Sequence, residues 1–173
     1  MTNETKNKLE ILVVEDRAEN IAAAKTALEG KANLDIAKNY EDGLKKIEEG
    51  VYHFGIFDLE LPRREGMNTE RLGFELENAA EKYALDYALI TTGTDHRKSD
   101  AAFVRYCFDE KRNRANNFEE ITGLPKSDPR AWNEVYNSLV RGHEYIQDVF
   151  DAKQWYFKTT GKTALNPFYK EEK

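Results

Sequence analysis

Four short apolar segments, each followed by polar residues, constrain the fold of this 173-residue chain most strongly. Residues 11–14 are apolar throughout, which is typical of a parallel strand that is buried on both faces. The other three segments are residues 34–37, 52–57 and 84–91, and the intervening stretches predict helices over 20–28, 40–49 and 70–83. Strands that alternate with helices of this length predict βαβ units and a parallel sheet.

The alternation of strands and helices is less clear after Thr94. Residues 98–114 carry many charges and are interpreted as a helix. Residues 103–108 and 121–124 compete as the last strand, and we favour 121–124 because Asp128-Pro129 after it starts a helix well. Apolar residues at helical spacing then predict one long helix over 129–157.

Composition excludes several classes of protein. With 26 Lys and Arg against 32 Asp and Glu, the net charge of −6 argues against a nucleic-acid-binding protein. The single cysteine, Cys107, excludes an intramolecular disulfide and a cysteine-rich zinc site. Because no apolar run has the length of a membrane helix and residues 1–10 lack the core of a signal peptide, we expect a cytoplasmic protein without a membrane partner.

Polar residues stand where the expected strands end. Glu15 and Asp16 follow the first strand, Asp58 follows the third and Thr92 follows the fourth. In parallel α/β sheets, ligands bind at the carboxyl ends of the strands. Carboxylate oxygens there suit Mg²⁺, and a carboxylate beside that ion can act as a nucleophile toward a phosphoryl group.

Three motifs in this order resemble the receiver domain of bacterial response regulators. They are ILVVED at 11–16, FDLELP at 57–62 and LITTG at 89–93, with 42 residues from Asp16 to Asp58 and 34 from Asp58 to Thr92. The resemblance implies that Asp58 is the phosphoacceptor and that Glu15, Asp16 and Asp58 hold Mg²⁺. It also implies that Thr92 is the switch hydroxyl, which binds a phosphoryl oxygen.

The family also has a lysine at the end of its fifth strand. Lys126, in the sequence LPKSDP at 124–129, is the preferred candidate, and Lys111 is the second. Gly123 stands where the family has an aromatic residue, and the interval from Thr92 to Lys126 is longer than usual. We therefore expect an enlarged region around the fourth helix.

The resemblance implies an α/β fold with a doubly wound, five-stranded parallel sheet of the flavodoxin type and a long C-terminal helix. Residues 1–150 are interpreted as this receiver-like domain and residues 151–173 as a helical extension, without a separate effector domain. A homodimer through the long helix is an option that the sequence leaves open.

The leading functional hypothesis is a stand-alone receiver that accepts a phosphoryl group on Asp58 from a histidine kinase or phosphotransfer protein. Its output would pass through contacts with another protein, and its enzymatic activity would be limited to phosphorylation and dephosphorylation of its own aspartate. One alternative is a receiver-like interaction module that is not phosphorylated. Another is a phosphatase of the haloacid dehalogenase type, in which Glu60 would act as the acid two residues after Asp58.

Overall fold

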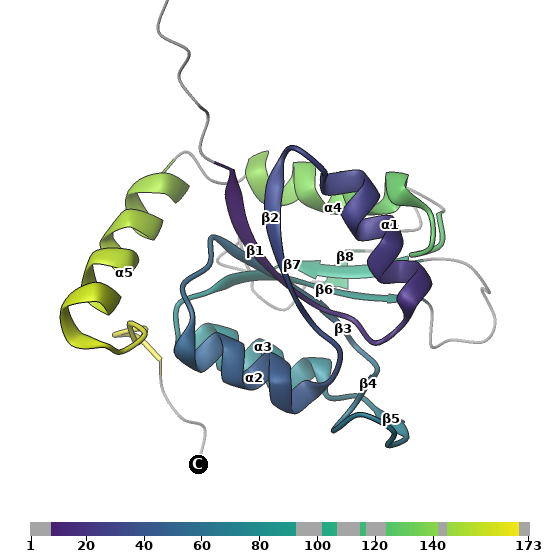
Figure 1. Cartoon of the computed structure of the whole chain (residues 1–173), viewed down its shortest axis with the longest axis horizontal. Coiled ribbons are helices and arrows are strands. Elements are labelled where there is room, and N and C mark those ends of the chain that lie inside the picture. The colour runs from purple at the N-terminus through teal and green to yellow at the C-terminus, as the bar shows by residue number, and fades with distance from the viewer. Residues whose placement is uncertain (1–7, 93–101, 107–114, 117–123, 142–144, 170–173) are drawn as a thin grey trace, which may run out of the picture.

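A parallel sheet of four strands forms the centre of the molecule. The computed structural model describes residues 8–92, 102–106, 115–116, 124–141 and 145–169 (Figure 1). The parallel strands are β1 (Leu9–Val14), β2 (Ala32–Ala37), β3 (Phe54–Asp58) and β6 (Asp86–Thr92), in the order β2-β1-β3-β6. The α/β class and the parallel pairing predicted from the apolar segments are confirmed.

The strand beside β6 differs from the prediction. β7 (Ala102–Tyr106) pairs with β6 in the antiparallel direction, and β8 (Ala115–Asn116) pairs with β7 in the same way. The helix predicted over 98–114 is therefore wrong at 102–106, where Phe, Val and Tyr favour a strand. The predicted strand at 121–124 stays a prediction over 121–123, which lie outside the described residues, while Leu124 lies outside any strand. A fifth parallel strand is absent from the described part of the chain.

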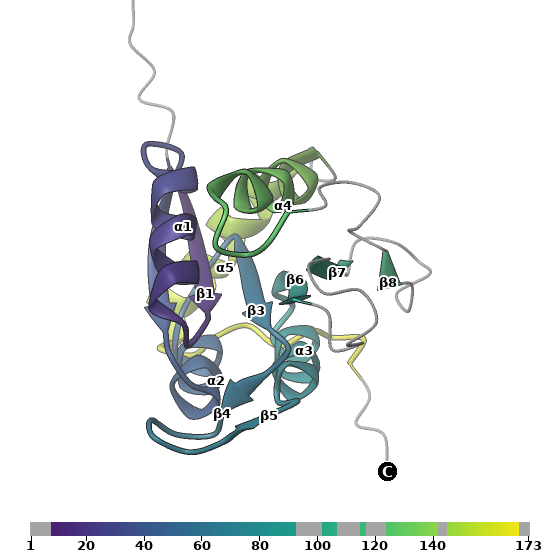
Figure 2. The same cartoon turned by 90° about the vertical axis from the view of Figure 1, so that its right-hand side faces the viewer.

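Helices cover both faces of the sheet. α1 (Ala18–Leu28) and α4 (Pro129–Arg141) pack on one face, and α2 (Tyr40–Glu49) and α3 (Gly73–Lys82) pack on the other. Alternate residues of β1 serve the two cores, with Ile11 and Val13 in the first and Leu12 and Val14 in the second. This explains why residues 11–14 of the strand are apolar at every position. Figure 2 shows α4 above the sheet and α2 and α3 below it.

The loop after β3 contains a small antiparallel hairpin of β4 (Leu61–Pro62) and β5 (Thr69–Glu70). At its far end the chain enters α3, whose first residue is Gly73. The hairpin and the start of α3 therefore both lie at the carboxyl end of β3.

The long helix predicted over 129–157 is also wrong, because two helices occupy this region. α4 ends at Arg141, and α5 runs over Ile146–Thr160. α5 lies beside the domain (Figure 1), where the Phe150 ring stacks on His53 with ring centroids 3.7 Å apart.

The segment after α5 binds the ends of two other helices. The Thr163 hydroxyl donates to the carbonyl of Glu48 at 2.6 Å, and the Asn166 amide side chain donates to the carbonyl of Glu81 at 3.1 Å. The last carbonyls of a helix have no partner within the helix, so these bonds satisfy groups at the ends of α2 and α3. Among the described helices, none is long and apolar enough to span a membrane.

Candidate functional site

The ends of β1 and β3, which are neighbours in the sheet, hold the first two site residues. Glu15 directly follows β1, and its N–H donates to the carbonyl of Ala37 at 3.0 Å. Asp58 ends β3, and the next N–H, of Leu59, donates to the carbonyl of Ile90 at 2.8 Å. These ladder bonds fix the backbone on which both carboxylates stand.

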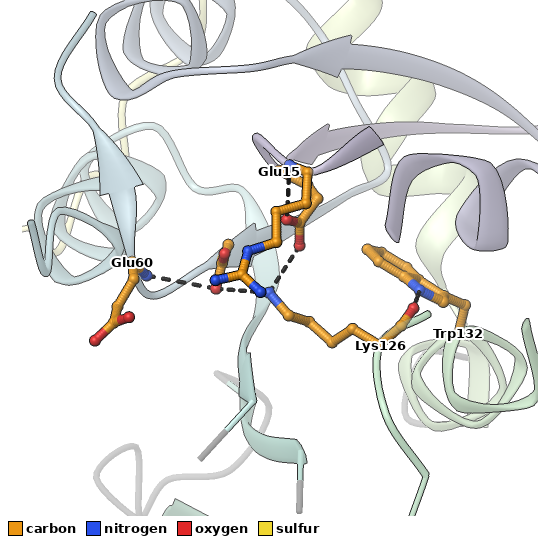
Figure 3. Close-up of polar contacts among 6 residues, drawn as sticks. Glu15, Glu60, Lys126 and Trp132 are labelled. Carbon is orange, nitrogen blue, oxygen red and sulfur yellow. Dashed lines mark hydrogen bonds and ion pairs between the residues drawn. The ribbon is translucent and has the colours of Figure 1, made fainter. Parts of the chain in front are cut away.

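Lys126 joins these two carboxylates. Its Nζ lies 2.8 Å from Oε2 of Glu15 and 2.8 Å from Oδ1 of Asp58. Lys126 and Asp58 are each 4% exposed and Glu15 is 0% exposed, so the ion pairs are shielded from water. Figure 3 shows the Lys126 side chain extending to Glu15. Sequence positions 15, 58 and 126 therefore meet in one buried cluster.

A turn in front of α4 delivers Lys126 to this cluster. The Asp128 N–H donates to the carbonyl of Pro125 at 2.9 Å, which closes the turn around Lys126. The Asp128 side chain accepts from the N–H of Arg130 at 2.9 Å and so caps the helix. The resemblance to receiver domains implies that Lys126 stands at the end of a fifth strand. The structure instead brings it from a turn that the start of α4 holds in place.

Asp16 completes a group that could hold a metal ion. Ligand oxygens of Glu15, Asp16 and Asp58 lie within 4.8 Å of one another. Oδ1 of Asp16 is buried and has no hydrogen-bond partner among the described residues, so its desolvation is not compensated there. If all three carboxylates are ionised, the group keeps a net negative charge, even with Lys126 paired to two of them and the charge of Arg17 acting on Asp16. Oxygen donors with this charge fit Mg²⁺.

Burial and like charge raise the proton affinity of this cluster. Burial raises the pKa of Asp58 to about 7; Lys126 opposes this shift, while the charge of Glu15 adds to it. Burial also raises the pKa of Asp16, and the charge of Glu15 adds to that shift. A cation bound between these groups would favour their ionised forms.

Gly73 lets α3 approach the peptide that follows Asp58. A Cβ at position 73 would lie 2.5 Å from the carbonyl oxygen of Asp58 and 2.7 Å from Cα of Leu59. We expect Gly73→Ala to lower the free energy of unfolding by about 2 kcal/mol, because relieving these contacts requires the backbone of β3 or α3 to shift. Urea unfolding measures this change.

Gly43 in α2 offers a matched control for that substitution. A Cβ there would meet the two Val14 methyl groups at 2.9 and 3.0 Å, and side-chain methyls adjust more easily than backbone. Alanine also has the higher helix propensity, by about 1 kcal/mol. We expect Gly43→Ala to stay within about 1 kcal/mol of the parent. Equal losses for both variants would contradict the close approach at Asp58.

For Thr92 the structure describes the backbone, and Lys111 lies outside the described residues. The Thr92 backbone ends β6, two residues after Ile90, which pairs with Asp58. Trp132 is a further residue of the site that no sequence motif indicates; its Nε1 donates to the carbonyl of Lys126 at 2.6 Å (Figure 3). Its only sequence signal is a tryptophan just inside the helix that follows Lys126.

Comparisons with models of known families, with curated proteins and with solved structures found no match to this chain.

Proposed function

We propose that the chain is a receiver-like signalling module in which Asp58 accepts a phosphoryl group. The observation that carries the proposal is the convergence of Lys126 on Glu15 and Asp58, beside an Asp16 oxygen that lacks a partner among the described residues. The strand order β2-β1-β3-β6 supports it, because it matches the first four strands of the doubly wound flavodoxin-like order. In such sheets ligands bind at the switch point between β1 and β3, where these residues lie.

In the proposed reaction, a carboxylate oxygen of Asp58 attacks phosphorus and forms an acyl phosphate. The bond that breaks is P–N when the donor is phosphohistidine, whose imidazole takes up a proton, and P–O when the donor is acetyl phosphate, which leaves as acetate. Glu15, Asp16 and Asp58 would hold Mg²⁺, which supplies positive charge for the transferring phosphoryl oxygens. Lys126 would bind one of these oxygens, and we expect the Thr92 hydroxyl to bind another.

Signalling would follow from the change of charge at the buried cluster. A phosphoryl group on Asp58 adds negative charge and hydrogen-bond acceptors beside Lys126, whose turn leads directly into α4. We propose that a histidine kinase or phosphotransfer protein supplies the phosphoryl group and that output passes to another protein.

Intact mass after incubation with Mg²⁺ and acetyl phosphate tests the proposal. We expect one phosphoryl adduct that hydroxylamine removes, and none with Asp58→Asn or with EDTA. Glu60→Gln is the matched control, because Glu60 is nearby but only its backbone N–H, 3.4 Å from Asp58 Oδ1, contacts the cluster. No adduct from acetyl phosphate or from a panel of phosphorylated histidine-containing proteins would contradict the proposal.

Mg²⁺ affinity supplies a second test, through the orphaned oxygen of Asp16. We expect Asp16→Asn to weaken Mg²⁺ binding about tenfold or more in calorimetric titrations, because it removes a charged ligand. Asp35→Asn is the control, since Asp35 pairs with Lys46 at 2.7 Å on a different part of the surface. The same Mg²⁺ affinity in parent and Asp16→Asn would place the ion elsewhere.

The alternative of an interaction module that is not phosphorylated is favoured by one observation. β7 runs antiparallel beside β6, where the resemblance implies a parallel strand. This alternative requires neither an adduct nor Mg²⁺ binding, so the two tests above separate it from the receiver proposal. The phosphatase alternative gains no such support, because the Glu60 carboxyl group points away from Lys126 in Figure 3.

A further inference from the structure

The position of the Lys126 backbone must be precise, because its side chain forms two ion pairs at once. Its ammonium must reach Glu15 and Asp58 together, at 2.8 Å from each, inside a region that water does not fill. The attraction within a buried ion pair offsets the cost of desolvation only when the geometry of the pair is good. Leu124 and Pro125, the described residues directly before this turn, lie outside any strand, so contacts from α4 help to fix the Lys126 backbone.

Trp132 provides one contact that holds the Lys126 backbone in place. It is 1% exposed and packs in the core between the sheet, α1 and α4, among residues that include Ala24 and Ala27. Its one polar atom, Nε1, donates to the carbonyl of Lys126 at 2.6 Å. A phenylalanine could fill much of the same apolar space, so packing alone does not require the indole N–H.

We propose that Trp132 is a positioning residue, which ties the Lys126 backbone to the helical core so that the ammonium reaches both carboxylates. Figure 3 shows this arrangement, with Trp132 at the backbone end of Lys126 and Glu15 at the ammonium end. The inference concerns the charge cluster itself and holds whether or not Asp58 accepts a phosphoryl group.

Chemical labelling of lysine amines tests this inference. Reductive methylation, followed by mass spectrometry of peptides, compares Lys126 with the exposed Lys25 in the same sample. We expect Trp132→Phe to speed labelling of Lys126 about tenfold relative to Lys25, which corresponds to the loss of one hydrogen bond. Trp155→Phe is the matched control, because Trp155 is 67% exposed on α5, and it should leave the labelling of Lys126 unchanged.

An isosteric replacement separates the hydrogen bond from the packing. The chain has two tryptophans, so in a Trp155→Phe background Trp132 is the only one. Benzothienylalanine, which has sulfur in place of the indole N–H, keeps the bicyclic shape and should also speed labelling of Lys126. Circular dichroism verifies that this protein is folded. Unchanged protection of Lys126 in the folded isostere would overturn the inference, even if Trp132→Phe fails to fold.

Discussion

Lys126→Met is expected to lower the free energy of unfolding by about 3–5 kcal/mol at pH 7.5. The substitution keeps most of the side-chain volume but removes the one cation that, among the described residues, forms ion pairs with Glu15 and Asp58. Both carboxylates are buried and would keep their charges without a partner, or would have to bind protons. Urea unfolding followed by circular dichroism measures the loss, and lowering the pH should reduce it.

Lys46→Met provides the matched control for this prediction. Lys46 makes an ion pair of similar length, 2.7 Å with Asp35, but the two side chains are 33% and 42% exposed. Ion pairs at the surface contribute at most about 1 kcal/mol, because water already solvates their charges. We expect a loss below about 1 kcal/mol for Lys46→Met. Losses of the same size in both variants would show that Lys126 does not compensate a buried charge.

Asp58→Asn is expected to stabilise the metal-free protein at high pH and to have little effect near pH 4. The pKa of Asp58 is raised from 3.8 to about 7, so the folded state keeps a proton that the unfolded state has lost between these values. The stability of the parent therefore falls as the pH rises through this window, whereas asparagine does not titrate.

The expected gain in stability of Asp58→Asn can be estimated from the shift in the pKa of Asp58. About three pH units correspond to an upper bound of about 4 kcal/mol, and the substitution also removes one partner of Lys126. We expect Asp58→Asn to be more stable than the parent by about 2 kcal/mol at pH 8 in EDTA. Thermal or urea unfolding from pH 4 to pH 8 measures the difference, with Glu60→Gln as the control. A difference that does not grow with pH would contradict the raised pKa.

Mg²⁺ should reduce this difference in stability between Asp58→Asn and the parent. A ligand that binds the folded state stabilises it, and Asp58→Asn removes one of the expected ligands. We therefore expect saturating Mg²⁺ to stabilise the parent at pH 8 more than it stabilises Asp58→Asn.

The central sheet could be predicted because its strands are buried on both faces. Residues 11–14 and 52–57 are apolar enough that a parallel core strand is the simplest interpretation, and β1 and β3 lie there within a few residues. The helices between them were predicted equally well, since their apolar residues recur at helical spacing. Residues 103–108 were a candidate for the last strand, and β7 overlaps them, but 121–124 was preferred. The antiparallel pairing of β7 with β6 depends on tertiary contacts, and charges surround β7 in the sequence, so no local pattern selects it.

The acidic part of the site followed from simple topology. Glu15, Asp16 and Asp58 stand at the ends of neighbouring parallel strands, so any such sheet brings them together. Lys126 was proposed from the resemblance, but its route through a capped turn was not predicted. The bond from Trp132 depends on how α4 packs against α1, which no local pattern in the sequence specifies. The role of the Thr92 hydroxyl stays a prediction.

The central claim, that Asp58 is the phosphoacceptor, is tested most directly by locating the modified residue. Hydroxylamine converts an acyl phosphate into a hydroxamate, which marks the carboxyl group that carried it. After treatment with Mg²⁺ and acetyl phosphate, peptide mass spectrometry should find the hydroxamate at Asp58 and at neither Glu15 nor Asp16. A hydroxamate at another carboxyl group, or at none after reaction with phosphohistidine donors as well, would contradict the claim.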